Sequence, residues 1–569
     1  MRLSVEEKLL LIVVAATLTG ALLLLSAGQG SEPGQKPWRA DSGLHFVTRL
    51  LNFDYAFPTP KGVTVKRLAR GAGAAAALVL AAVMWVRRHS ESIDPFPVRG
   101  QPIETAPVAR PQRWTDAVTA ADGAQLALLA FVAWSFISAL WAPWSAVALG
   151  ESALLAMGAV WAMCLGRCLS RRGAVAGTLI LLALLVLTAV IGLWYYYERN
   201  PVQRLKFPIG NPLFMAACLL PGVVVAFCLG VGSARKAVLA RCERCTVGAM
   251  AALLALAPLC WALRLTDSRG AMLGSGVGLW AAAYVCARGI WRWLLVGLGL
   301  VGIVLAAGFF QHRMTDLEGG RGASMRTRIY GWRYAGELFL ARPVQGLGQG
   351  GYSLQAETLS FADAENDPLA FPGDRFTHAH NEWLETLADL GAVGITLLAM
   401  AFGLTFWGCR HVVQARAGTL EGWCYVGLIA AMAALAAEEA TNVALRLPGL
   451  PVVWYTVLGL IWALMRREAR PAQRAVPFAK PVLWSGAALA VALAAGLLMW
   501  SVRNWHGALA QARVAELLNR QQWLQAQTAA IVGRQGRLGA DEVADSLAQK
   551  LFCHIRIVGF HLDSLMTSA

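Results

Sequence analysis

The stretch THAHNEWLETLADLGAVGITLLAMAFGLTFW, residues 377–407, decides how this chain folds. Its second part, Leu387 to Trp407, is an apolar run long enough to cross a bilayer as a helix, which takes roughly 20 residues. Its first part places His378, His380 and an amide at the mouth of that span. Imidazole is the side chain best suited to accept a proton at neutral pH, so the position suggests chemistry at a membrane surface.

Comparable apolar runs recur along the chain. Hydrophobic residues make up 57% of the 569 positions and charged residues 15%, and the mean hydropathy is +0.52. This composition excludes a single soluble core. We predict an all-α fold, a polytopic transmembrane bundle of about 12–14 spans with a large periplasmic loop. The candidate spans are residues 8–27, 71–87, 123–142, 146–168, 173–195, 212–232, 246–264, 271–289, 291–310, 387–408, 421–439, 450–465 and 481–501.

The net charge of +16 does not indicate a nucleic-acid partner, because the basic residues fall mainly in short loops between spans. Sixteen of them lie in one alternate set of loops and six in the other. The positive-inside rule makes the richer set cytoplasmic. The N-terminus is then inside, whereas the loop before His380 and the C-terminal tail are outside. The 28–70 segment fits this topology poorly.

The spans and loops predict five regions. Residues 1–122 carry N-terminal spans and loops, 123–310 form a membrane core, and 311–386 form a periplasmic loop. Residues 387–501 hold the C-terminal spans, and 502–569 form a periplasmic helical tail. A loop as long as 311–386 is more often functional than not.

Two external turns carry arginine next to a helix start. Arg204 and Lys206 precede Gly210-Asn211-Pro212, where Asn211 is a good N-cap. Ser268 or Asp267 can cap the helix that follows Arg269. A helix N-terminus flanked by basic side chains suits an anion such as phosphate. The alternative is that these arginines reach lipid headgroups or pair with nearby carboxylates.

The periplasmic loop contains two further patterns. Residues Arg326 to Leu340, with Arg328 near their start, predict an amphipathic helix along the membrane interface. The glycines of 342–350 lack the ending of a nucleotide-binding loop, so we interpret them as a tight turn.

These motifs, in this order, resemble the O-antigen ligase and O-antigen polymerase superfamily of bacterial inner-membrane glycosyltransferases. The similarity covers roughly residues 120–465 and rests on the following elements: Arg204-x5-Gly-Asn-Pro, Ser268-Arg-Gly, Arg326-x3-Tyr, Pro343-x2-Gly-x-Gly, His378-Ala-His-Asn-x2-Leu and Leu390-Gly-x2-Gly. Leu213 departs from the Asn-Pro-Asn that many relatives carry.

The resemblance implies transfer of a glycan from undecaprenyl diphosphate to an acceptor hydroxyl on the periplasmic face of the inner membrane, without a metal or other cofactor. Arg204 and Arg269 would hold the diphosphate, and His380 would activate or orient the hydroxyl. The candidate substrate-binding residues are Lys206, Asn211, Ser268, Arg326, Arg328, His378, Asn381 and Glu382. Judged from the residues alone, His378 is expected to bond a loop carbonyl and Glu382 to be a solvated carboxylate.

The sequence leaves the identity of the acceptor open. Lipid A core would make the protein an O-antigen ligase of lipopolysaccharide biosynthesis, which we favour narrowly. A second lipid-linked chain would make it a polymerase, and a protein acceptor an oligosaccharyltransferase. A lipid-linked glycan flippase is the alternative from another class. Transporters place ionisable groups near the bilayer midplane, whereas here the span interiors hold almost none besides Glu438 and Glu439.

Overall fold

The computed structural model describes residues 3–22, 60–90, 120–199, 204–209, 211–315, 323–359, 378–415, 418–446, 449–465, 485, 487–496 and 498–499. Within these ranges the chain is helical and has no strand. The helices are α1 (Val5–Leu22), α3 (Pro60–Ser90), α4 (Ala120–Ile137), η3 (Ser138–Leu140), α5 (Ser145–Cys168), α6 (Arg171–Arg199), α7 (Pro212–Ala240), α8 (Glu243–Leu265), α9 (Arg269–Cys286), α10 (Ile290–Thr315), α11 (Ala323–Ala341), α12 (Gly351–Leu359), α13 (Glu382–Ala415), α14 (Leu420–Glu438), η4 (Ala444–Arg446) and α15 (Leu450–Met465). The predicted tail helices at 502–569 lie outside the described residues.

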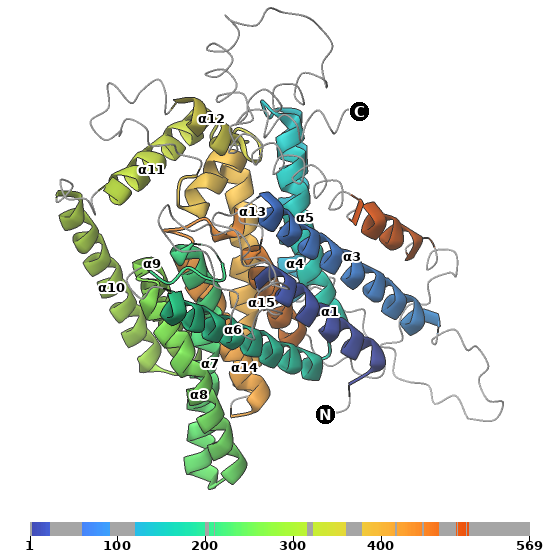
Figure 1. The fold of residues 1–569 in the computed structure, drawn as a ribbon, viewed down its shortest axis with the longest axis vertical. Coiled ribbons are helices and arrows are strands. Elements are labelled where there is room, and N and C mark those ends of the chain that lie inside the picture. The colour runs from blue at the N-terminus through green and yellow to red at the C-terminus, as the bar shows by residue number, and fades with distance from the viewer. Residues whose placement is uncertain are drawn as a thin grey trace, which may run out of the picture.

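The predicted all-α membrane fold is confirmed. Among the described residues, seven helices are long and apolar enough to cross a membrane: α4 with η3, α5, α6, α7, α8, α13 and α14. Shorter apolar helices occur at Arg70–Val86, Ile290–Val304, Leu450–Met465 and Ala487–Gly496. The protein is therefore a multi-pass membrane protein, and Figure 1 shows its helices gathered around α15.

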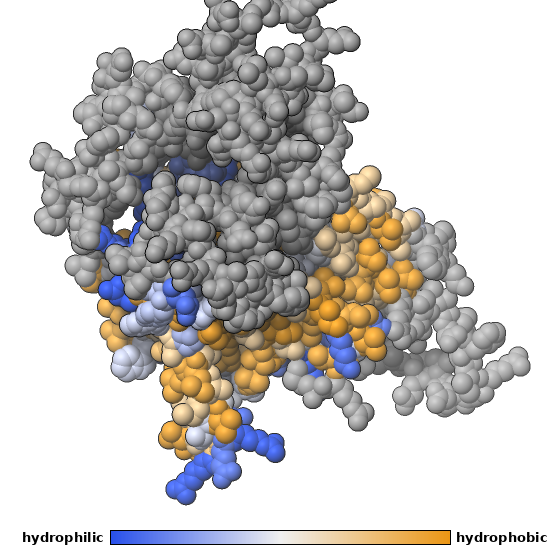
Figure 2. All heavy atoms as spheres, viewed as in Figure 1, coloured by the Kyte–Doolittle hydropathy of each residue, from blue (hydrophilic) through white to orange (hydrophobic). Residues whose placement is uncertain are grey.

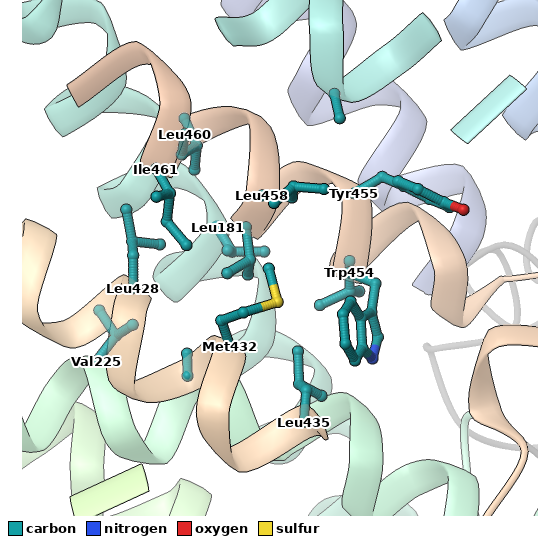
Figure 3. Packing of buried hydrophobic residues seen from close by; sticks show 14 of the residues in the cluster. Leu181, Val225, Leu428, Met432, Leu435, Trp454, Tyr455, Leu458, Leu460 and Ile461 are labelled. Carbon is teal, nitrogen blue, oxygen red and sulfur yellow. The ribbon is translucent and has the colours of Figure 1, made fainter. Parts of the chain in front are cut away.

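Helix α15 forms the centre of the bundle because every residue from Leu450 to Leu464 is buried. It packs against α5, α6 and α14. Figure 3 shows the contact, where Leu181, Met432 and Trp454 come together from three different helices. Glycines allow the backbones to approach closely: a Cβ on Gly459 would lie 2.7 Å from the carbonyl oxygen of Ala162. Small residues at helix contacts are typical of membrane bundles.

The outer surfaces of α8 and α10 are apolar. Leu254, Leu298 and Ile303 are more than half exposed, and Figure 2 shows hydrophobic side chains on the flanks above a hydrophilic tip. Side chains of this kind suit contact with lipid tails. The tip is the α7–α8 turn, which carries the basic residues Arg235, Lys236, Arg241 and Arg244. At 23 residues, α8 spans about 34 Å, so this turn and the Arg269 turn lie on opposite sides of a bilayer.

The loop Pro343–Gly350 forms backbone hydrogen bonds on both sides of a break in α13. Gly391, at φ 66° and ψ −167°, interrupts the helix, which frees backbone groups on either side of it. Leu347 donates its N–H to the carbonyl of Ala388 at 3.0 Å, and Ala392 donates to Pro343 at 2.8 Å. The predicted tight turn is confirmed, and the helix predicted before it is present as α11. Its position along the membrane interface stays a prediction.

Replacing Gly391 with alanine is expected to destabilise the protein. Its backbone angles are essentially reserved for glycine, at a cost of about 1–3 kcal/mol for other residues, and the new Cβ would overlap the carbonyl oxygen of Val344. Thermal unfolding in detergent would measure the loss. Gly403→Ala in the same helix is the control, since its Cβ would meet nothing within 4 Å. Equal melting temperatures for the two variants would contradict the expectation.

Candidate functional site

Arg204 is tied to the turn between α8 and α9. Its guanidinium donates to the carbonyl of Thr266 at 2.7 Å and to that of Asp267 at 2.9 Å. The backbone N–H of Leu205 donates to Leu265 at 2.9 Å, so the segment before α7 is paired with the end of α8. Two of the five guanidinium donors are thus occupied, and the exposed side chain keeps the others. The two arginine motifs, Arg204 and the turn that ends at Arg269, therefore form one surface, which we call the arginine surface.

Helix α9 begins at this surface. The buried side chain of Ser268 caps it by accepting the N–H of Ala271 at 3.4 Å, and Arg269 is exposed in its first turn. Gly270 lies against the end of α14, where an added Cβ would overlap the hydroxyl of Thr441. The N-terminus of α9 therefore meets the C-terminal turn of α14.

The same turn of α14 receives the start of α13. The backbone N–H of Glu382 donates to the carbonyl of Glu439 at 2.9 Å and is 3.2 Å from that of Asn442. Asn442 in turn donates its side-chain amide to Glu438 at 2.6 Å. These bonds join the arginine surface to the histidine motif, although the two are more than a hundred residues apart in the chain.

Residues 378–381 fold into a hook against α13. Asn381 caps the helix by accepting the N–H of Leu384 at 3.1 Å. The buried carboxylate of Glu385 accepts the N–H of Ala379 at 2.9 Å and lies 2.9 Å from Nδ1 of His378. His380 follows with φ 51°, a left-handed conformation that a non-glycine residue seldom adopts. Such strain is often found at functional sites. We call residues 378–381 the histidine hook.

Arg446 binds three carboxylates of α13 at once. Its guanidinium lies 3.1 Å from Glu382, 3.2 Å from Glu385 and 2.7 Å from Asp389. These acidic side chains are at most 7% exposed, and that of Arg446 is 10% exposed. Asp389 also accepts the N–H of Tyr352 at 2.7 Å. We call these four charged residues the Arg446 network; it joins η4, α13 and the start of α12.

Arg328 of α11 lies between the arginine surface and the histidine hook. It interacts electrostatically with Glu438 and Arg204, and its pKa is lowered, first by burial. Burial, then the charge of Arg328, lowers the pKa of His380 to about 4. Nδ1 of His380 is buried and has no hydrogen-bond partner among the described residues. The His380 imidazole is therefore neutral at physiological pH.

The pKa of His378 is shifted in the opposite direction. Burial disfavours its charged form, but the adjacent Glu385 carboxylate outweighs that effect and raises the pKa. Its side chain is 30% exposed. The pKa values of the two imidazoles are thus shifted in opposite directions, although only one residue separates them.

A small pocket adjoins the Arg446 network. Its polar lining includes Arg70, Gln349 and Glu382, while most of the other walls are apolar. Arg70 is buried in α3, where it donates to the carbonyl of Leu154 and lies 5.8 Å from the ring centre of Tyr455.

Most of the sequence-predicted site residues meet at one end of the bundle. They are Arg204, Ser268, Arg269, Arg328, His378, His380, Asn381 and Glu382. Lys206 and Asn211 lie in the connection before α7, where the Asn211 side chain accepts the N–H of Leu213 at 2.9 Å as the predicted cap. The side chain of Arg326 lies outside the described residues. The roles of these residues in binding or catalysis stay predictions.

Two expectations are wrong. Glu382 is not a solvated carboxylate, because the hook folds back and buries it against Arg446. His378 bonds a carboxylate instead of a loop carbonyl.

Sequence reasoning missed Glu385, Asp389 and Arg446. The first two, with Glu382, stand at spacings of three and four residues, which place them on one helical face. Acidic groups on one face of a membrane helix need a cation, so this spacing was the signal. Across the described residues, no group of three His, Cys, Asp or Glu side chains is arranged to hold a metal ion.

Comparison with known proteins gives one finding on the family. A family model described as O-antigen ligase matches residues 251–399. The match confirms the resemblance to this superfamily for about a quarter of the chain. It spans Arg269, Arg328 and the histidine hook, and it excludes Arg204 and Arg446. No curated protein matches the chain.

Proposed function

Because residues 251–399 are those of an O-antigen ligase domain, we propose that the protein transfers a glycan from undecaprenyl diphosphate to an acceptor hydroxyl. The proposed acceptor is lipid A core oligosaccharide, and the proposed location is the periplasmic face of the bacterial inner membrane. The observation that carries the proposal is the meeting of the arginine surface, Arg328 and the histidine hook at one end of the bundle.

The reaction requires compensation of charge on the departing diphosphate. Arg204 and Arg269 are exposed at the N-terminal end of α9, where guanidinium donors and the helix dipole both favour phosphate oxygens. Helix α9 is 18 residues long and capped, so its first N–H groups are held in place.

The acceptor hydroxyl has to be oriented toward the sugar carbon that leaves the diphosphate. His380 is suited to this role, because a neutral imidazole can hydrogen-bond a hydroxyl without repelling the neighbouring cation. Arg328 lies close enough to His380 to influence its protonation. The diphosphate and the acceptor would therefore meet between the arginine surface and the hook.

Reconstitution in vesicles with a lipid-diphosphate glycan tests the function directly. Lipid A core, a second lipid-linked glycan and a protein acceptor would be offered separately, and the product analysed by mass. Transfer to lipid A core supports the ligase, and transfer to the second glycan the polymerase. Movement of the donor between leaflets without transfer to any acceptor would overturn the proposal in favour of a flippase.

Arg269→Lys is expected to lower the transfer rate about tenfold or more. Lysine keeps the charge but loses the planar fork that binds two phosphate oxygens, and a hydrogen bond to a charged group contributes about 1.5–3 kcal/mol. Initial rates in the vesicle assay would measure the effect. Arg333→Lys is the matched control, because Arg333 is 61% exposed on α11 and lies 3.0 Å from Glu337 on the same helix. An unchanged rate for Arg269→Lys would argue against a diphosphate clamp at this position.

A further inference from the structure

The carboxylate of Glu385 fixes the orientation of the His378 ring. The two side chains are 2.9 Å apart through Nδ1 and Oε1, and Glu385 is fully buried. A carboxylate beside Nδ1 holds the proton on that nitrogen, so Nδ1–H donates to Glu385 and Nε2 carries the free lone pair. The same carboxylate accepts the N–H of Ala379 at 2.9 Å. The Glu385 carboxylate therefore fixes both the His378 ring and the backbone at Ala379.

The carboxylate is itself immobilised. Arg446 lies 3.2 Å from Glu385 and also binds Asp389 at 2.7 Å. Asp389 is held in turn by the N–H of Tyr352 at 2.7 Å. A base whose partner is fixed in this way is pre-organised for proton transfer, as in a Ser-His-Asp arrangement, where the carboxylate orients the imidazole.

The other histidine of the hook lacks these features. Nδ1 of His380 is buried without a hydrogen-bond partner among the described residues. The charges of Arg328 and His378 disfavour its protonation and outweigh the opposing effect of Glu385. A proton added to His380 would be opposed by Arg328 and would have no hydrogen-bonded carboxylate beside Nδ1. A proton added to His378 would be placed beside Glu385, and the 30% exposure of that side chain keeps it within reach of a substrate.

We propose that His378 is the proton acceptor of the transfer site and that Glu385 is its positioning residue. The inference rests on the proposed function. In the step, the acceptor oxygen bonds to the sugar carbon and the bond from that carbon to the diphosphate oxygen breaks. The diphosphate leaves with the electron pair, and the hydroxyl proton moves to Nε2 of His378. His380 orients the hydroxyl and takes no proton.

The pH dependence follows from the charged groups around His378. Glu385 and Glu382 of α13 favour its protonated form, and Arg446 of η4 opposes it. The pKa of His378 is raised overall, and a base must be neutral to act. Transfer should thus be present at high pH and be lost as the pH falls through that raised pKa. Removing the Glu385 charge lowers the pKa and moves this acid limb to lower pH.

The test is a rate–pH profile in vesicles for the wild type, His378→Gln, Glu385→Gln and Glu385→Asp. His378→Gln should lose about 10²-fold in kcat or more, the range of general-base catalysis, and should lose the acid limb. Glu385→Gln should lose rate and shift the limb to lower pH. Glu385→Asp, which keeps the charge, should leave the limb in place.

The outcomes separate the two proposals. If the wild type transfers glycan to no acceptor at any pH, the proposed function fails. If the wild type is active and His378→Gln keeps its full rate and an unmoved limb, only the role of His378 fails. Melting temperatures identify any variant that is unfolded. If Glu385→Gln does not fold, His378→Gln decides the question, because its partly exposed side chain can be changed without removing a buried charge.

Discussion

Replacing Arg446 with leucine is expected to cost about 3–5 kcal/mol of stability, the range measured when one partner of a buried ion pair is removed. The guanidinium lies within 3.2 Å of Glu382, Glu385 and Asp389, and the latter two are fully buried. Without it, three carboxylates face one another away from water. Thermal unfolding in detergent would measure the loss, together with the yield of monodisperse protein.

Two comparisons make this expectation specific. Arg333→Leu removes an exposed arginine that lies 3.0 Å from Glu337 on the same helix, and such pairs contribute less than about 1 kcal/mol. Arg446→Leu combined with Glu382→Gln and Asp389→Asn should recover part of the loss, because fewer uncompensated charges stay buried. An Arg446→Leu variant as stable as Arg333→Leu would show that the network does not hold this end of the bundle.

The bundle itself could be predicted from the sequence because its main determinant is local. Apolar runs of span length indicate membrane helices without knowledge of their partners, and the run at 450–465 coincides with α15. The caps at Asn211 and Ser268 were equally accessible, since a cap involves residues only two or three positions apart.

The Arg446 network could not be predicted from local sequence patterns. Arg446 contacts Glu382 across 64 positions and Asp389 across 57, and a single sequence does not reveal which buried charges pair. Alone, Arg446 is one more basic residue in a short external loop. The burial of Glu382 depends on the same long-range contact, which is why a solvated carboxylate was expected there.

The histidine motif could be recognised from the sequence that surrounds it. The different environments of its two imidazoles could not, because they arise only in the folded protein. Its place before an apolar run is visible in the sequence. The pKa of His380 is lowered by burial and then by Arg328, whereas Glu385 raises that of His378. Neither the burial nor these neighbours can be assigned from spacing. The left-handed backbone of His380 is also a property of the folded hook, since only a small minority of non-glycine residues adopt it.

His380→Ala is expected to lower glycan transfer by about 10²-fold or more, the loss that follows when a reacting group is no longer correctly placed. Because the pKa of His380 is lowered to about 4, its imidazole is neutral throughout the range in which transfer would be assayed. Its removal should therefore reduce the rate equally from about pH 5 upward and leave the acid limb unmoved. This pattern differs from that expected for His378→Gln and Glu385→Gln.

The positive φ of His380 provides the control for this variant. Alanine removes the imidazole and keeps the strained backbone, whereas His380→Gly removes the imidazole and relieves the strain. His380→Asn tolerates the same backbone and keeps a hydrogen-bonding side chain. If the imidazole orients the hydroxyl, alanine and glycine should lose similar activity and asparagine less. If only the shape of the hook matters, the glycine variant should retain the wild-type rate, and His380 would have no part in placing the acceptor.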